Sequence, residues 1–438
     1  MAVKPGCKRT EVGIIPDEWN ALSLGEVLIK GRLGGNYENQ DIESELPLMK
    51  MGNLARGCFD LSKVQFIRPG VAPEPVHQLR CGDVLFNTRN TLDLVGKVAI
   101  WRDELPVAYY NSNLMRLEFD PEKVCSNDYA NYALNTEGVI SRLRGLATGT
   151  TSVAAIYTRD LLKLQVPVPP LSEQRAIATA LCDVEALLRA LERLIAKRRN
   201  LQQAVMQKLL TGQARLPGFS TSESEAFQKT DVGEIPRDWV VRQLGELVDQ
   251  ARSIRYGIVQ PGKYDPNGRL MIRGQDYSKG WVDPSEFFRV SVSVEERYEN
   301  ARVATGDLIM TIVGAGTGHV EAIPHWLNGA NLTQTTARIA VDTSKADSVF
   351  VKYMLRTPVG ARQITSFMKG AAQPGLNCGD IEKFAVPMPS TLSEQTAIAT
   401  VLSDIDVELV TLEQRLAKTR ALKQSMMQEL LTGRTRLV

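Results

Sequence analysis

The sequence Leu171-Ser-Glu-Gln-Arg-Ala-Ile-Ala-Thr179 occurs twice in this chain, the second time as Leu392-Ser-Glu-Gln-Thr-Ala-Ile-Ala-Thr400. Each copy is followed by a long helical pattern and then by Leu-Leu-Thr-Gly, at 209–212 and at 430–433. The offset is 221 residues at both ends of the pattern (392 − 171 and 430 − 209). Since a long internal period dictates architecture, we predict two halves that each close with a helix of the same length.

The repeat extends upstream of these helices. Four further pairs of landmarks keep the same order in the two halves: Thr10–Trp19 with Thr230–Trp239, Leu-Gly-Glu at 24–26 with 244–246, Gly82–Leu85 with Gly306–Ile309, and Val166–Pro169 with Val386–Pro389. Most residues between the landmarks differ. This pattern is typical of one fold that is used twice with two different surfaces.

Bulk composition places the chain among ordinary globular proteins. It has 438 residues, 43% hydrophobic and 23% charged, which predicts two to four domains. The net charge of +2 is too small to demonstrate nucleic-acid binding and does not exclude it, because a basic face can be offset elsewhere. The six cysteines include no CxxC and predict reduced thiols in a cytoplasmic protein. No apolar run approaches the roughly 20 residues of a membrane span, and no signal-peptide pattern occurs, so we expect no membrane contact.

Two helices of about 40 residues each, over 172–211 and 393–432, are the main predicted elements. At ~1.5 Å per residue each would be roughly 60 Å long. Ser172 and Ser393 are the predicted N-caps, with Glu173 and Glu394 at the positive end of the helix dipole. Gly212 and Gly433 would end the helices.

Apolar residues in both helices recur with a period of 3.5, which is the signature of a coiled coil. The predicted seam residues are Ile177, Leu181, Val184, Leu188, Leu191 and Ile195 in the first helix, and Ile398, Leu402, Ile405, Leu409, Leu412 and Leu416 in the second. The seam then meets Arg198 and Gln202, or Thr419 and Lys423, before it resumes. We interpret this break as a point where the helices change neighbours. Antiparallel pairing is favoured over parallel pairing or separate packing on each domain.

Residues of roughly 20–165 and 240–385 lack long helical periodicity. Short β-like runs occur at 83–86, 97–101, 115–119, 307–313 and 336–341, and helical stretches follow near 127–145 and 347–369. Each half is therefore predicted to contain a mixed α/β domain with strands before helices, giving an α/β (α+β) fold with an internal pseudo-two-fold repeat.

No catalytic constellation is found in the sequence. His77, His319 and His325 have no metal-ligand spacing, so no metal is expected. A P-loop, a GxSxG elbow and the Asn/Asp-Pro-Pro-Tyr/Phe motif of amino-methyltransferases are all absent. Gly314–Gly318 is better interpreted as a turn than as a phosphate loop, and Asp17 and Glu18 lie in the repeated Pro-x-x-Trp element, where a packing role for the tryptophan is favoured.

The doubled set of Val-Gly-x-Ile-Pro-x-x-Trp, Val-Pro-x-Pro, Leu-Ser-Glu-Gln and Leu-Leu-Thr-Gly resembles the specificity (S) subunit of type I restriction–modification enzymes over the whole chain. The resemblance implies two target recognition domains, each recognising one half of a split double-stranded DNA sequence, separated by an antiparallel coiled coil. It also implies two methyltransferase subunits that bind S-adenosylmethionine and modify adenine, and a translocating restriction subunit. The chain itself would be non-catalytic and would carry no cofactor. The implied boundaries are 1–170 and 218–390 for the recognition domains, and 171–217 and 391–438 for the helices.

Candidate DNA-binding residues follow from the chemistry of base edges and phosphates, which selects Arg, Lys, Asn and Gln in loops. The candidates in the first half are Arg32, Tyr37, Lys50, Asn53, Arg56, Arg89 and Asn90, and those in the second half are Arg255, Tyr256, Arg273, Gln275, Tyr277, Lys279 and Gln373. We align 50–53 with 272–275 around their shared glycine. Each candidate could equally be a solvated loop residue, and Tyr37 and Tyr256 could equally belong to the core.

Three other functions remain possible at this stage. One is a coiled-coil scaffold that never contacts DNA, which salt-sensitive and sequence-selective binding would exclude. The second is an enzyme with an unfamiliar site, which activity of the purified chain alone would reveal. The third is the specificity subunit of a different restriction system with the same frame.

Overall fold

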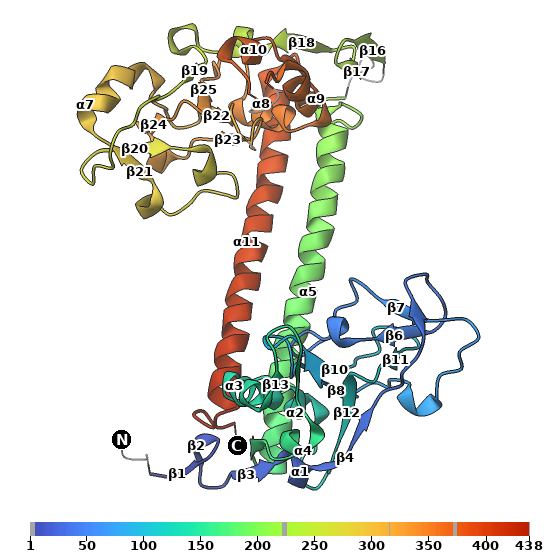
Figure 1. The fold of residues 1–438 in the computed structure, drawn as a ribbon. Helices are drawn as coiled ribbons and strands as arrows, with labels where there is room; N and C mark the ends of the chain where they lie inside the picture. Colours follow the sequence, from blue (N-terminus) through green and yellow to red (C-terminus); the bar gives the residue numbers. More distant parts are fainter. Residues whose placement is uncertain (1–4, 221–225, 315, 371–374, 438) are drawn as a thin grey trace. The chain divides into compact units, whose positions relative to one another are not determined.

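The computed structural model describes residues 5–220, 226–314, 316–370 and 375–437 (Figure 1). The chain divides into two compact units: unit 1 contains residues 1–193 and 414–438, and unit 2 contains residues 194–413. Each unit thus combines one globular domain with part of both long helices. Within the described ranges, no helix is both long and apolar enough to cross a bilayer.

The centre of unit 1 is an antiparallel sheet with the strand order β10-β8-β12-β4. Its strands are β4 (Leu28–Leu33), β8 (Val84–Asn87), β10 (Val98–Ile100) and β12 (Leu114–Phe119). Helices α2 (Asn127–Leu134) and α3 (Glu137–Leu146) follow the last of these strands. The smaller elements are β1 (Cys7–Thr10), β2 (Gly13–Pro16), β3 (Asn20–Ser23), α1 (Leu24–Val27), β5 (Asn39–Gln40), β6 (Pro47–Met49), β7 (Gln65–Ile67), β9 (Arg89–Asn90), β11 (Tyr109–Tyr110), β13 (Thr148–Gly149), β14 (Ala154–Ala155), α4 (Thr158–Leu161) and β15 (Gln165–Val168).

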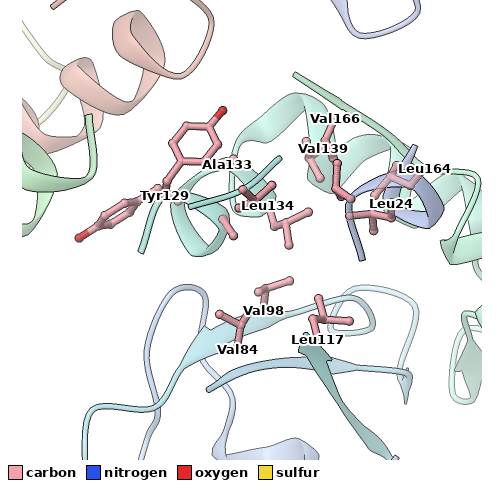
Figure 2. Packing of buried hydrophobic residues seen from close by; sticks show 14 of the residues in the cluster. Leu24, Val84, Val98, Leu117, Tyr129, Ala133, Leu134, Val139, Leu164 and Val166 are labelled. Atoms are coloured by element: carbon pink, nitrogen blue, oxygen red, sulfur yellow. The ribbon is translucent and has the colours of Figure 1, made fainter. Parts of the chain in front are cut away.

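Alternation along these strands gives the sheet two covered faces. Val84, Phe86 and Leu117 belong to a core shared with α2, whereas Leu85 and Ala99 belong to a second core beneath the loops that carry β6 and β11. Figure 2 shows the first core, with Val84, Val98 and Leu117 of the sheet facing Ala133 and Leu134 of α2. A period of two along a strand places successive side chains on opposite faces, so both faces are apolar and both are covered.

Unit 2 repeats this plan around the sheet β19-β25-β22-β23. Its strands are β19 (Arg255–Tyr256), β22 (Leu308–Thr311), β23 (Val320–Ala322) and β25 (Thr336–Ile339), and α8 (Ser348–Leu355) and α9 (Pro358–Phe367) follow. The other strands and helices are β16 (Phe227–Thr230), β17 (Gly233–Pro236), β18 (Trp239–Gln243), α6 (Leu244–Leu247), β20 (Arg269–Ile272), β21 (Phe288–Val290), α7 (Val292–Glu295), β24 (Asn331–Leu332), α10 (Cys378–Glu382) and β26 (Ala385–Pro389). The predicted mixed α/β domains with strands before helices are confirmed.

The two long helices are α5 (Leu171–Leu210) and α11 (Leu392–Leu430). They run antiparallel in both units. In unit 1, Arg420 bonds to Glu192 at 2.6 Å and Lys423 to Glu185 at 2.5 Å, and in unit 2, Arg198 lies 3.0 Å from Glu408. The predicted antiparallel coiled coil is therefore present (Figure 1).

The helix starts differ from the prediction. Both helices begin one residue earlier, at Leu171 and Leu392, so Ser172 and Ser393 lie inside the first turn and are not N-caps. The amides of Glu173 and Gln174 donate to the carbonyl of Pro170 instead. The ends agree with the prediction, because Gly212 and Gly433 have φ of +68° and +69°, a conformation that favours glycine after a helix.

The interpretation of the seam break as a change of neighbours is wrong. Arg198, Gln202 and Lys423 keep their seam positions and meet acidic residues of the opposite helix: Gln202 donates to Asp406, and Lys423 donates to Glu185. Thr419 is 8% exposed. The helices therefore remain partners within each unit, and the polar residues mark a hydrophilic stretch of the same interface.

The predicted apolar seam residues occupy the expected positions along the two helices. Ile177, Leu181, Leu191 and Ile195 are buried, and Val184 and Leu188 are half-buried. In α11, Ile398, Leu402 and Leu409 are buried, and Ile405, Leu412 and Leu416 are half-buried.

Candidate DNA interface

Several of the candidate residues of unit 1 stand on the surface of its strands and loops. Arg89 is exposed and Asn90 half-buried on β9, in a small ribbon with β13 and β14. Arg32 lies on β4, where its guanidinium is 3.8 Å from Glu118. Lys50 donates to Gln65 at 2.7 Å and to Asn39 at 3.3 Å, so its ammonium group is held by side-chain amides, without a carboxylate.

Two candidates, Asn53 and Tyr277, are buried and cannot contact a base in this conformation. Asn53 is 4% exposed, and its side chain donates to the carbonyls of Asp60 and Lys63 and accepts from the amide of Lys50. Tyr277 is 1% exposed, with its hydroxyl 2.7 Å from Thr311. A buried polar group needs a hydrogen-bond partner inside the protein, and both side chains have one. The sequence pattern did not distinguish these buried residues from exposed loop residues.

Tyr37 and Tyr256, for which the sequence left both DNA contact and core packing open, differ in the structure. Tyr37 is half-buried, and its hydroxyl is engaged by His77 at 2.6 Å and by the amide of Glu74 at 2.9 Å. Burial raises the pKa of Tyr37 above its ordinary value. Tyr256 is 48% exposed on β19. Tyr256 therefore remains a candidate for base stacking, whereas the contacts of Tyr37 favour a packing role.

The alignment of 50–53 with 272–275 is wrong by one position. The amide of Lys50 donates to the side chain of Asn53 at 2.9 Å, and the amide of Arg273 donates to Asp276 at 2.8 Å, each across a short 3-10 turn. Lys50 therefore corresponds to Arg273, and Asn53 to Asp276. The guanidinium of Arg273 also pairs with Asp276 at 2.8 Å, so much of its donor capacity is used inside the domain.

Among the remaining candidates of unit 2, Arg255, Gln275 and Lys279 are exposed. Gln373 lies outside the described residues.

In unit 1, neither terminal nitrogen of Arg56 has a hydrogen-bond partner in the described part of the chain. Burial and the nearby charge of Arg144 lower the pKa of Arg56. Arg56 is thus a cation without a counter-charge, a state that a bound anion would relieve.

The repeated motifs meet at one buried cluster in each unit, which sequence reasoning missed. In unit 1, Glu173 has a fully buried carboxylate that accepts from Arg436 at 2.5 Å and from the indole of Trp19 at 2.8 Å, and Arg436 also bonds to Glu18. In unit 2, Arg215 bonds to Glu394 at 2.5 Å and to Asp238 at 2.9 Å. The offset of 221 between Arg215 and Arg436 was the signal that could have found them.

The glycine that ends each helix packs against the Pro-x-x-Trp element in the same cluster. A Cβ at Gly433 would lie 2.4 Å from Pro16, and one at Gly212 would lie 2.3 Å from Pro236. Trp19 and Trp239 are 0% and 1% exposed, which agrees with the predicted packing role. Leu-Leu-Thr-Gly and Pro-x-x-Trp are thus two parts of one contact.

The glutamine of each Leu-Ser-Glu-Gln motif fixes the start of a domain helix. The side chain of Gln174 accepts from the amide of Cys125 at 3.1 Å and donates to the carbonyl of Pro169 at 2.9 Å. Gln395 accepts from the amide of Asp347 at 3.0 Å and donates to Pro389 at 2.9 Å. The most strongly repeated residues therefore build the frame, and the candidate DNA-binding residues lie elsewhere.

No group of three or more His, Cys, Asp or Glu residues that could hold a metal ion occurs in the part of the chain that the structure describes. The histidines lie in structural contacts: His77 bonds to Tyr37, and His319 lies 3.3 Å from the carbonyl of Tyr277. The candidate residues thus form polar and partly cationic surfaces on two similar domains. Such surfaces are suited to binding a ligand rather than to catalysing a reaction.

Comparison with known proteins identifies the class. Residues 76–198 and 236–420 match the family model described as type I restriction modification DNA specificity domain, and these two stretches cover most of the chain. The chain therefore belongs to this family. The family is non-catalytic and supplies DNA sequence specificity to a restriction–modification system.

Relatives of known name are similar over nearly the full length. The chain is 26% identical over 434 residues to a putative type I restriction enzyme MjaX specificity subunit of Methanocaldococcus jannaschii, covering 98% of this chain and 96% of that protein. It is 27% identical over 437 residues to the type I restriction enzyme EcoBI specificity subunit of Escherichia coli, covering 96% and 86%. A crystal structure of the type I S subunit from M. genitalium shares the fold, with a TM-score of 0.58, 14% identity and 98% coverage of both chains.

Proposed function

We propose that this chain recognises a bipartite, asymmetric sequence in double-stranded DNA, with one half-site for each globular domain. The two domains would be bounded as 1–170 and 218–390, with the helical segments 171–217 and 391–438 between and after them. In the complex, two methyltransferase subunits that bind S-adenosylmethionine would modify adenine, and restriction subunits would cleave. The chain would supply specificity and docking surfaces, and no cofactor of its own.

One observation supports this function best: the main contacts of the frame are repeated in both units, whereas the exposed surface is not. The Arg215–Glu394 and Arg436–Glu173 pairs correspond, because the two arginines and the two glutamates are each 221 residues apart. By contrast, the candidate positions carry different chemistry in the two units. The positions of Arg89 and Asn90 on the ribbon of β9 correspond to Val313 and Gly314 in unit 2, which carry no polar side chain. Two different surfaces on one frame are what two unlike half-sites require.

The candidate contacts are those whose donors remain available. We retain Arg89 and Asn90 in unit 1, and Arg255, Gln275 and Lys279 in unit 2, as the leading candidates for groove or phosphate contacts. Arginine and glutamine can bind base edges through two hydrogen bonds, and lysine can position the duplex by contact with a phosphate. Tyr256 could stack on a base or a sugar.

The experiment is to map genomic adenine methylation in cells with and without this chain, with the methyltransferase subunit present in both. We expect a motif with two short specified parts and an unspecified gap that appears only when the chain is present. A continuous motif would contradict recognition by two domains. Unchanged methylation would favour the scaffold alternative, and a motif marked on another base would assign the chain to a different restriction system.

A further inference from the structure

Unit 2 contains a cavity of about 600 Å³ whose wall is rich in arginine. Four guanidinium groups line it, from Arg252, Arg255, Arg302 and Arg338, and Glu299 is the single carboxylate among the lining residues of the described chain. Two of the four arginines are paired with carboxylates that are not among the lining residues: Arg252 donates to Asp307 at 2.9 Å, and Arg302 donates to Glu295 at 2.7 Å. The other two, Arg255 and Arg338, carry the excess positive charge.

Arg255 and Arg338 face each other across the antiparallel pair β19–β25. Residues directly opposite on such a pair have side chains on the same face, and like charges there are destabilising. Arg338 is 3% exposed, and its guanidinium donates to the carbonyls of Asn300 at 2.9 Å and Arg302 at 2.7 Å. Its Nε has no hydrogen-bond partner among the described residues. Arg255 is exposed and makes no ion pair within them.

Unit 1 has the same two arginines and shows how their charge can be compensated. Arg32 and Arg116 face each other across β4 and β12, as Arg255 and Arg338 do across β19 and β25. There the carboxylate of Glu118 lies 3.8 Å from Arg32 and 3.4 Å from Arg116, and Asp83 lies 3.1 Å from Arg116. The chain therefore supplies two carboxylates to the arginine pair of unit 1.

In unit 2, neither arginine of the pair forms an ion pair with a carboxylate of the described residues. The residue at the position of Glu118 is Ala340, two residues after Arg338 as Glu118 is two after Arg116. Asp307 occupies the position of Asp83 but is bound by Arg252. Burial, followed by the charges of Arg252 and Arg255, lowers the pKa of Arg338, and the opposing charges of Asp307 and Asp249 do not cancel this effect. An oxyanion between Arg255 and Arg338 would stand where Glu118 stands in unit 1.

We propose that this cavity binds a phosphate group of the DNA backbone, held by Arg255 and Arg338. Guanidinium groups bind phosphate through paired, charge-assisted hydrogen bonds, and a partly open, arginine-lined cavity offers several donors to one oxyanion. The contact rests on the proposed DNA-recognition function and deepens it, because it assigns a phosphate clamp to unit 2. Unit 1 has no such clamp at the corresponding place, where Glu118 and Asp83 already hold the arginines.

The test uses the full chain in complex with its methyltransferase subunits and a duplex that carries the methylated motif. Arg255→Gln removes the exposed cation, and Arg242→Gln removes a cation of unit 2 that is paired with Glu246 on the surface. Affinity is measured as a function of salt. Loss of one phosphate contact reduces the slope of log K against log[salt] by about 1. We expect this reduction for Arg255→Gln on cognate and unrelated duplexes alike, and no change for Arg242→Gln.

A second variant tests the charge argument without DNA. Arg255→Glu places a carboxylate opposite Arg338, as Glu118 provides in unit 1, and is expected to raise the melting temperature of the free complex.

An unchanged salt slope for Arg255→Gln overturns the DNA contact. If millimolar inorganic phosphate at matched ionic strength then stabilises the wild type but not Arg255→Gln, the cavity binds free phosphate instead. A lower melting temperature for Arg255→Glu, with no phosphate effect, overturns the anion site altogether. A wild-type complex that does not bind DNA contradicts the proposed function, while the phosphate measurement still decides the chemistry of the cavity.

Discussion

Glu173 and Glu394 show how much a single repeated residue can determine. The sequence suggested a favourable charge at the start of a helix, whereas the structure places each carboxylate in a buried cluster with an arginine from the segment that follows the other long helix. The two clusters differ in one detail. Arg215 bonds to both oxygens of Glu394, and the indole nitrogen of Trp239 has no partner in the described chain, whereas Trp19 donates to Glu173.

We predict that Arg215→Met destabilises unit 2 strongly. The side chains of Arg215 and Glu394 are 7% and 5% exposed, and burial raises the pKa of Glu394 even with the arginine present. Removing the cation leaves an unpaired buried carboxylate, which costs about 3–5 kcal/mol of unfolding free energy. Urea denaturation measures the loss.

The matched control is Arg436→Met in unit 1, where the indole of Trp19 still donates to the buried Glu173 carboxylate after the arginine is removed, so the loss should be smaller. Adding Glu394→Gln to Arg215→Met should restore part of the stability, because it removes the uncompensated charge. Equal losses at the two arginines, or no recovery in the double variant, would contradict the assigned role of the buried cluster.

His319 gives unit 2 a stability that depends on pH near neutrality. Burial, followed by the charge of Arg356, lowers the pKa of His319 below its ordinary 6.5. The unfolded chain therefore binds a proton below pH 6.5 that the folded chain does not, so stability falls as pH falls from 6.5 towards the folded pKa. Replacing His319 with Asn should flatten this part of the profile in urea denaturation between about pH 5.5 and 7.5. A wild-type profile that stays level through this window would contradict the prediction.

Candidate site residues were predictable by type but not by exposure. Arg255 and Arg89 emerged from loop chemistry and are exposed, whereas Asn53 and Tyr277 have the same composition signal and are buried. The difference depends on partners distant in sequence, such as the carbonyl of Lys63 for Asn53 and the hydroxyl of Thr311 for Tyr277. A single sequence does not show such contacts.

At the scale of elements, the long helices were the most predictable part. A 3.5-residue period over matched lengths predicted their pairing, and the positions of Gly212 and Gly433 predicted their ends. Their starts were missed because a backbone carbonyl before each helix, of Pro170 or Thr391, accepts the first amides in place of the serine side chain. The polar stretch was misinterpreted because Gln202 and Lys423 look unsuited to a seam until their partners Asp406 and Glu185 are known.

The strands followed the same rule. The runs at 83–86, 115–119 and 336–341 correspond closely to β8, β12 and β25, because these central strands carry several apolar residues within a short stretch. Two-residue strands such as β9 and β19 carry no such pattern, and they were missed. These short elements hold several of the candidate residues, so the site was less predictable than the frame that carries it.

For the whole molecule, the repeat was sufficient to predict the class of fold, since the two halves conserve their landmarks while the surfaces differ. The clusters at Trp19 and Trp239 explain why those landmarks recur together: each unit is completed by the end of a helix that begins in the sequence of the other half. The repeat could not indicate that unit 1 compensates its arginine pair with Glu118 while unit 2 leaves Arg255 and Arg338 open. That difference has two sources, Ala340 at the position of Glu118 and Asp307 paired with Arg252, and neither position belongs to a motif that reveals it.

We propose that the length of the two helices sets the gap between the two half-sites in the DNA target. The most direct measurement is the methylation motif of a chain that lacks residues 190–196 and 411–417, one heptad from each helix between the retained Glu185–Lys423 and Gln202–Asp406 contacts. The deletion preserves the seam register and shortens each helix by ~10 Å, about three base pairs of duplex at 3.4 Å each. We predict the same two half-sites with a shorter gap; an unchanged gap with both half-sites intact would contradict the account.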